Sequence, residues 1–175
     1  MPLKSNIPVL GFAAYSGTGK TTLLKKIIPM LTQQGIRIGM IKHAHHQFEI
    51  DYPGKDSFEL RKAGAQQMLI ASSSRMALIT ELETAQEPQL DYLISRLEQT
   101  SLDLILVEGF RQISYPKIEL HRPSLGKPLL CQEDRSIIAL ASGAPTEIQP
   151  VIPLLDLNNP EQITAFIQTE ILDSR

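Results

Sequence analysis

The sequence predicts an α/β protein in which helices flank a mostly parallel sheet. Helical and strand patterns alternate along the chain, as they do in sheets built through helical crossovers. A strand pattern, a glycine-rich turn and a helical pattern follow one another in residues 8–24. The chain has 175 residues, enough for one sizeable core, so we expect a single domain over residues 1–175.

Residues 8–24 read PVLGFAAYSGTGKTTLL. The apolar run Val9–Ala14 has the length of a buried strand, and a helical pattern follows from Leu23. A glycine-rich turn with Gly-Lys-Thr in this context is a phosphate-binding P-loop. Ala14 stands where the first glycine of the motif is usual, and its methyl group is small enough for the turn. We therefore predict a P-loop NTPase fold.

The residue types of this turn suit a nucleoside triphosphate. Gly17 and Gly19 allow the backbone N–H groups to point at phosphate oxygens. Lys20 can reach the β- and γ-phosphates and serve in catalysis, and the Thr21 hydroxyl can bind Mg²⁺. The predicted nucleotide-binding residues are Ser16, Gly17, Thr18, Gly19, Lys20, Thr21 and Thr22.

A polar cluster follows the second expected strand, Ile36–Ile41. It comprises Lys42, His43, Ala44, His45 and His46. In open α/β sheets ligands bind at the carboxyl ends of the strands. His43 and His45 share one strand face if the strand extends that far, which would suit a metal. We favour a polar loop that contacts phosphate or a partner, because no third ligand with clear spacing appears.

Asp56 has the position of a helix N-cap before the expected helix Ser57–Ala63, with Glu59 completing a capping box. The runs Gln67–Ala71 and Met76–Thr80 predict a hairpin, so we expect a mixed sheet. Pro88 opens the next helical pattern.

The apolar run from Leu102 ends in Glu108-Gly109. An acidic residue at the tip of a buried strand is the Walker B pattern, in which the carboxylate faces Mg²⁺ or its water shell. We predict this role for Glu108, whereas an ordinary strand-end carboxylate is the alternative.

The remaining elements are less sharply marked. Alternation over Pro116–Arg122 suits a half-exposed or edge strand, and Ser124–Asp134 has the composition of a loop. Ser136–Ala141 and Val151–Leu155 are apolar runs typical of buried strands. Pro160–Leu172 predicts a terminal amphipathic helix.

The sequence gives little indication of which nucleobase the chain binds, because the guanine-reading Asn-Lys-x-Asp motif is absent. Ser142 and Asp156 each follow an apolar strand. A backbone N–H near Ser142 could donate to guanine O6, and the Asp156 carboxylate could accept from N1 and N2.

The net charge is −2, which argues against attraction to nucleic acid or membranes. The single cysteine, Cys131, excludes an internal disulfide and suits a reducing cytoplasm. The first residues lack the apolar core of a signal peptide, so we expect a cytoplasmic protein.

Four separated segments together resemble the molybdopterin-guanine dinucleotide biosynthesis protein B family: AYSGTGKTTLLKK, IKHAHH, DYPGKDSFELRKAGA and LDLILVEGF. The resemblance implies a GTP-binding P-loop protein with weak Mg²⁺-dependent GTPase activity in molybdenum cofactor biosynthesis. It also implies a homodimer that works beside the molybdopterin guanylyltransferase and meets the molybdopterin cofactor. GTP rather than ATP rests on this resemblance.

A looser similarity to dethiobiotin synthetase implies that Asp56 and Glu108 both serve Mg²⁺ with Thr21. Lys55 and Arg61 could be solvent-exposed helix charges or could face an anionic pterin phosphate. A small-molecule kinase or ligase and a metal-delivery GTPase remain as alternative functions.

Overall fold

The computed structural model describes residues 3–44, 48–84, 87–145 and 150–173. The chain divides into two compact units, residues 1–43 with 88–175 and residues 44–87. The single domain over residues 1–175 stays a prediction.

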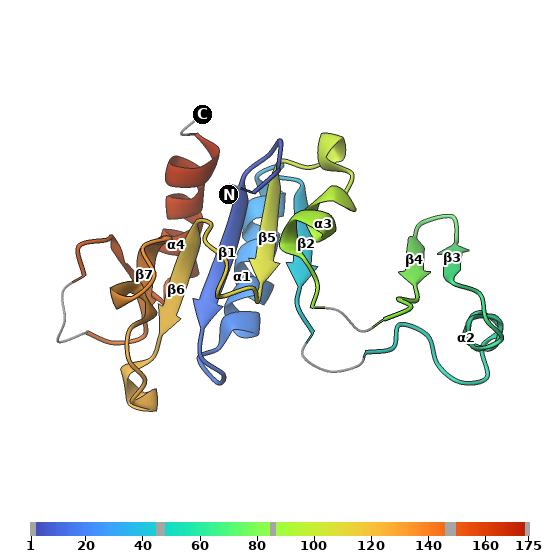
Figure 1. The fold of residues 1–175 in the computed structure, drawn as a ribbon. Helices are drawn as coiled ribbons and strands as arrows, with labels where there is room; N and C mark the ends of the chain where they lie inside the picture. Colours follow the sequence, from blue (N-terminus) through green and yellow to red (C-terminus); the bar gives the residue numbers. More distant parts are fainter. Residues whose placement is uncertain (1–2, 45–47, 85–86, 146–149, 174–175) are drawn as a thin grey trace. The chain divides into compact units, whose positions relative to one another are not determined.

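Unit 1 is built around a six-stranded sheet in the order β2-β5-β1-β6-β7-β8, and every pair of neighbours is parallel (Figure 1). This arrangement confirms the α/β fold class. The strands are β1 (Val9–Ala14), β2 (Ile38–Lys42), β5 (Leu104–Glu108), β6 (Lys117–His121), β7 (Ile137–Ser142) and β8 (Leu154–Asp156).

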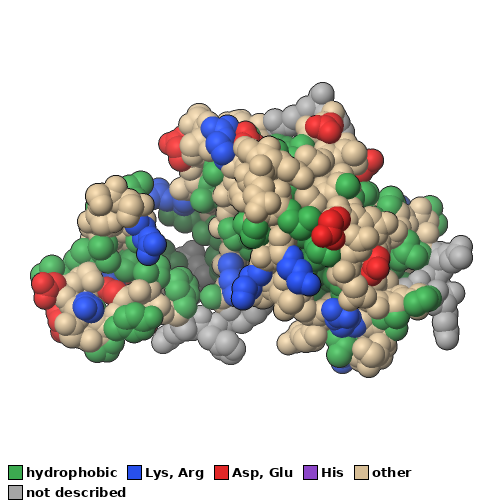
Figure 2. Space-filling view, turned by 180° about the vertical axis from the view of Figure 1, so that it is seen from behind, with side chains coloured by type: hydrophobic (Ala, Val, Ile, Leu, Met, Phe, Trp, Pro, Cys, Tyr) green, Lys and Arg blue, Asp and Glu red, His purple; other side chains and the backbone are tan. Residues whose placement is uncertain are grey.

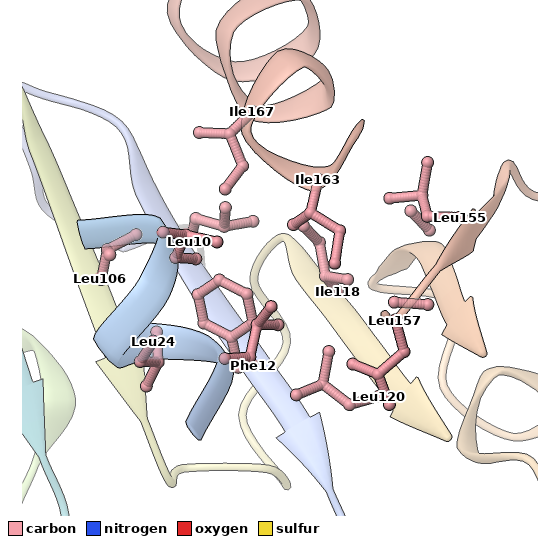
Figure 3. Close-up of a cluster of buried hydrophobic side chains, with 14 of the residues drawn as sticks. Leu10, Phe12, Leu24, Leu106, Ile118, Leu120, Leu155, Leu157, Ile163 and Ile167 are labelled. Atoms are coloured by element: carbon pink, nitrogen blue, oxygen red, sulfur yellow. The ribbon is translucent and has the colours of Figure 1, made fainter. Parts of the chain in front are cut away.

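Helices cover both faces of this sheet. Leu10 and Phe12 of β1 pack with α1 (Lys20–Gln33) and α4 (Pro160–Ile167) on one face (Figure 3). Val9, which precedes Leu10, packs with α3 (Leu90–Ser95) on the other face, because neighbouring side chains of a strand point to opposite faces. Short helical turns cover Gln99–Ser101, Pro123–Leu125, Leu130–Gln132 and the π-helical Gln168–Leu172.

Strand β6 corrects a prediction. It is neither half-exposed nor at an edge, since it lies between β1 and β7 and all five of its residues are buried. Its alternating charges are satisfied inside the protein. The two carboxylate oxygens of Glu119 accept from the N–H groups of Leu130 and Cys131, each at 2.8 Å.

Lys117 ties β6 to the loop that follows Glu108. Its ammonium donates to the carbonyls of Arg111 (3.2 Å) and Ile113 (2.5 Å) and pairs with Asp134 at 2.9 Å. Burial alone would raise the pKa of Asp134, but hydrogen bonds from Ser136 and Lys117 bring that pKa below its ordinary value. The ion pair therefore stabilises the fold at neutral pH, and its contribution declines as the pH falls through the range of Asp134.

Lys117→Met is expected to destabilise the protein by about 2 kcal/mol, because it removes the ammonium donor that two backbone carbonyls and Asp134 share. The difference from wild type should shrink in acid, where Asp134 is protonated. Denaturant titrations at neutral and acidic pH measure both effects, with Lys127→Met as a control at an exposed lysine. A wild-type midpoint at neutral pH would contradict this role of Lys117.

The C-terminal elements differ in part from expectation. The strand after residue 150 is Leu154–Asp156, at the edge of the sheet. Val151 and Leu154 are exposed, so the prediction of a buried strand over Val151–Leu155 is wrong. An edge strand pairs with a neighbour on one side alone, so it needs fewer apolar contacts than a central strand does. The predicted terminal helix is present, with its last turn in π geometry.

Unit 2 contains α2 (Asp56–Lys62) and the antiparallel hairpin of β3 (Gln67–Ala71) and β4 (Met76–Thr80). The predicted hairpin is confirmed, but it forms a sheet of its own. Asp56 is the first helical residue rather than the N-cap, which is Lys55. Glu59 accepts instead from the N–H of Gly54 at 3.2 Å, so the predicted capping box is wrong.

Arg61 is buried and therefore neither a solvent-exposed charge nor a free phosphate ligand. Its guanidinium pairs with Glu49 at 2.6 Å, with Asp51 at 2.7 Å and with Glu81. The partners lie 10–20 residues away in sequence, so the helical pattern alone could not reveal them. Among the described residues, no helix has both the length and the apolar character needed to cross a bilayer.

Candidate functional site

The glycine-rich turn links the carboxyl end of β1 to the N-terminus of α1, as predicted. Gly17 and Gly19 have φ angles of 82° and 98°, a region that favours glycine. The first N–H groups of a helix have no acceptor within it and favour anions. Because α1 has no side-chain cap, these donors suit phosphate oxygens.

Thr18 shapes this turn from within. It is 2% exposed, and its hydroxyl and N–H both donate to the Tyr15 carbonyl, at 2.8 and 3.3 Å. The turn is therefore braced by its own residues. Ser16, Thr21 and Thr22 are exposed beside it, so their polar groups are accessible to a ligand.

Glu108 lies at the carboxyl end of β5, in register with Phe12 of β1 and Lys42 of β2. One carboxylate oxygen is 3.8 Å from the Lys20 ammonium, and the other is 3.8 Å from that of Lys42. The predicted Walker B acid thus stands beside the P-loop lysine. A carboxylate here and the hydroxyl of Thr21 are hard oxygen donors, the class that Mg²⁺ prefers.

The backbone after Glu108 is unusual. Gly109 and Phe110 have φ angles of 103° and 52°, and the second is rare for a bulky residue. A Cβ on Gly109 would lie 2.6 Å from that of His43, so only glycine fits. The Phe110 ring stacks on the His43 ring at 4.8 Å, which fixes the end of β2 against this turn.

Ser142 and Asp156, predicted to read the base, pair in neighbouring strands and line one pocket of about 450 Å³. Asn158 also lines this pocket, and its side-chain amide donates to the Gly143 carbonyl at 3.1 Å. Asp156 is exposed, and one of its oxygens accepts from the Asn158 N–H at 2.8 Å. Two residues 14 positions apart thus meet where a nucleobase could enter.

Basic residues that sequence reasoning missed surround the P-loop. Arg122 donates from Nε to the Thr18 carbonyl at 2.8 Å. Arg111 and Lys127 lie over the ring of Tyr15, at 5.3 and 6.0 Å from its centre. Figure 2 shows Lys and Arg side chains gathered towards the edge at which the strand arrows of Figure 1 end. Arg122 directly follows β6, which ends at this edge. Its place after a strand was the one feature of the sequence that could have pointed to it.

Other predicted ligands are less closely defined. Asp56 belongs to unit 2, so its role at a metal with Thr21 and Glu108 stays a prediction. His45 and His46 lie outside the described residues. Within the described ranges, no group of three His, Cys, Asp or Glu side chains could hold a metal ion.

The chain is similar to proteins of molybdopterin guanine dinucleotide synthesis. The family model of MobB, described as molybdopterin guanine dinucleotide synthesis protein B, matches residues 9–143. A relative from Escherichia coli strain K12, the molybdopterin-guanine dinucleotide biosynthesis adapter protein, is 51% identical over 94% of this chain and 93% of its own length. The protein of that name from Haemophilus influenzae is 45% identical over 95% of this chain and 90% of its own length.

Solved structures agree on the fold. A MobB homologue from Bacillus stearothermophilus has a TM-score of 0.70 at 24% identity, covering 95% of this chain and 99% of that one. MobB of Bacillus subtilis has a TM-score of 0.71 at 19% identity, covering 94% and 98%. The glycine-rich turn between β1 and α1, the acidic end of β5 and these likenesses lead to one conclusion: the chain belongs to the MobB family of molybdopterin-guanine dinucleotide synthesis proteins.

Proposed function

We propose that this chain is a GTP-binding adapter of molybdopterin guanine dinucleotide biosynthesis with weak, Mg²⁺-dependent GTPase activity. The observation that carries the proposal is the position of Glu108, 3.8 Å from Lys20 at the mouth of the P-loop. A triphosphate held by the turn would place its β- and γ-phosphates at Lys20. Mg²⁺ would then be held by Thr21 and Glu108, with Asp56 as the third predicted residue, and would neutralise charge on the transferred phosphoryl group.

The pocket between β7 and β8 is the proposed base site. The Gly143 N–H is already used, since it donates to the His121 carbonyl at 2.9 Å. The Ala144 N–H makes only a 3.5 Å contact with the Ser142 hydroxyl, so it is the amide we assign to guanine O6. The exposed Asp156 carboxylate would accept from N1 and N2, contacts that adenine cannot make.

Asp156→Asn is expected to weaken GTP binding about tenfold, because a hydrogen bond to a charged acceptor is lost. Discrimination between GTP and ITP, which lacks the 2-amino group, should fall as well. Calorimetric titrations with both nucleotides measure this, with Asp173→Asn as a control at an exposed carboxylate in the last turn. Equal GTP and ITP affinities in the wild type would rule out the assignment of Asp156.

Unit 2 offers a surface for the proposed homodimer. The hairpin exposes large apolar side chains on a sheet of only two strands, which is marginally stable by itself. Met76 is 76% exposed, Leu69 61% and Leu78 45%, and hydrophobic side chains are visible on the surface of this unit in Figure 2. Exposed apolar patches mark association sites, so we propose that a second copy of the chain covers the hairpin.

GTP turnover with and without a molybdopterin-charged guanylyltransferase tests the adapter role. We expect slow turnover by the chain alone and a change in rate when the charged partner is present. Rapid turnover that needs only a small-molecule acceptor would favour the kinase or ligase function instead. Turnover that responds to a transition metal rather than to the partner would favour metal delivery.

A further inference from the structure

Arg122 contacts both halves of the proposed nucleotide site. Its Nε donates to the Thr18 carbonyl of the P-loop at 2.8 Å, and its Nη2 lies 3.7 Å from the position of a Cβ on Gly19. On its other side, Nη1 lies 2.8 Å from the position of a Cβ on Gly143, a residue that lines the pocket between β7 and β8. The side chain therefore lies between the P-loop and the pocket.

Gly143 gives the guanidinium this room. The Arg122 Cγ and Cζ lie 3.4 and 3.6 Å from the same Cβ position, so the whole end of the side chain rests on the glycine. The φ of Gly143 is outside the left-handed range, and its N–H pairs with the His121 carbonyl at 2.9 Å. An added Cβ would therefore meet the end of the Arg122 side chain, which would have to move.

Arg122 has no ion-pair partner in the described part of the chain. In residues 3–44, 48–84, 87–145 and 150–173, no carboxylate forms an ion pair with it and only Nε has a hydrogen-bond acceptor. A planar guanidinium stacks on aromatic faces, and its attraction to a ring increases when water is excluded. A purine in the adjacent pocket would present such a face to Arg122.

We infer that Arg122 is a base-positioning residue, which holds the P-loop through Nε and covers one face of the purine with its guanidinium. This inference rests on the proposed nucleotide-binding function and adds a residue to it. It predicts that Arg122 acts on affinity for the nucleotide but much less on affinity for the bare phosphate chain.

The test compares binding of GTP and of inorganic tripolyphosphate to the full chain by calorimetry in Mg²⁺. Arg122→Ala should lower GTP affinity about tenfold, as expected for loss of one stacked base contact, while tripolyphosphate affinity changes much less. Lys127→Ala is the charge-matched control, since it removes a cation beside Tyr15 and should leave the ratio of the two affinities unchanged. Melting curves verify folding.

A second variant reaches the same contact from the pocket. Gly143→Ala should displace the guanidinium and lower the GTP-to-tripolyphosphate affinity ratio, and the double variant should lose little beyond Arg122→Ala, because coupled residues are not additive. An unchanged ratio of GTP to tripolyphosphate affinity in Arg122→Ala would overturn the inference, whether both affinities fall equally, which would reduce Arg122 to a brace of the P-loop, or neither falls. A wild-type chain that prefers tripolyphosphate to GTP would instead refute the proposed function.

Discussion

Replacing Lys20 by alanine is expected to weaken GTP binding by about 3 kcal/mol, roughly a 150-fold loss of affinity. The physical reason is that Lys20 is the only P-loop residue with a positive side chain, and a triphosphate carries most of its charge where that ammonium lies. The substitution also leaves Lys42 as the remaining ion-pair partner of Glu108 among the described residues, so less positive charge is left beside this carboxylate to attract the γ-phosphate. Titration of the nucleotide in Mg²⁺ measures the effect.

Lys26→Ala provides the matched control for Lys20→Ala, because Lys26 is an exposed lysine of the same helix. It should bind GTP like the wild type. Circular dichroism establishes that both variants are folded. If Lys20→Ala bound GTP with wild-type affinity, the P-loop would not be the phosphate site and the proposed function would fail.

Glu108→Gln is expected to reduce GTP turnover by roughly 10- to 100-fold, the usual consequence of altering a group that holds a metal or its water. Glutamine keeps the size of the side chain and removes the charge, so the fold and much of the nucleotide affinity should remain. The concentration of Mg²⁺ needed for half-maximal turnover should rise. Single-turnover hydrolysis over a series of Mg²⁺ concentrations gives both quantities.

Glu133→Gln is the control for Glu108→Gln, since Glu133 is an exposed glutamate in a turn. The same Mg²⁺ series applied to Asp56→Asn tests the third predicted metal residue, which is the first residue of α2 rather than its N-cap. Normal turnover and normal Mg²⁺ dependence in Glu108→Gln would mean that this carboxylate only ends a strand.

The sequence by itself determined the P-loop and the strand that precedes it. The motif is contiguous, and its chemistry depends on residues within a single turn, so Gly17, Gly19 and Lys20 could be assigned without the fold. Glu108 could be predicted for a similar reason, because an apolar strand that ends in an acidic residue can be recognised from a short stretch of sequence. Parallel strands place their carboxyl ends at one edge, which also brought Ser142 and Asp156 into consideration together.

Only the tertiary structure decided what the charged residues of β6 and α2 do. Lys117, Glu119 and Arg61 have patterns typical of exposed elements, yet all three are buried. Their partners come from loops and strands that are distant in sequence or follow no periodic pattern. Arg122 was missed because its position between the P-loop and Gly143 depends on three separate strand ends meeting at one edge. Periodicity records which side of an element is apolar, whereas the pairing of a buried charge depends on contacts that exist only in the folded chain.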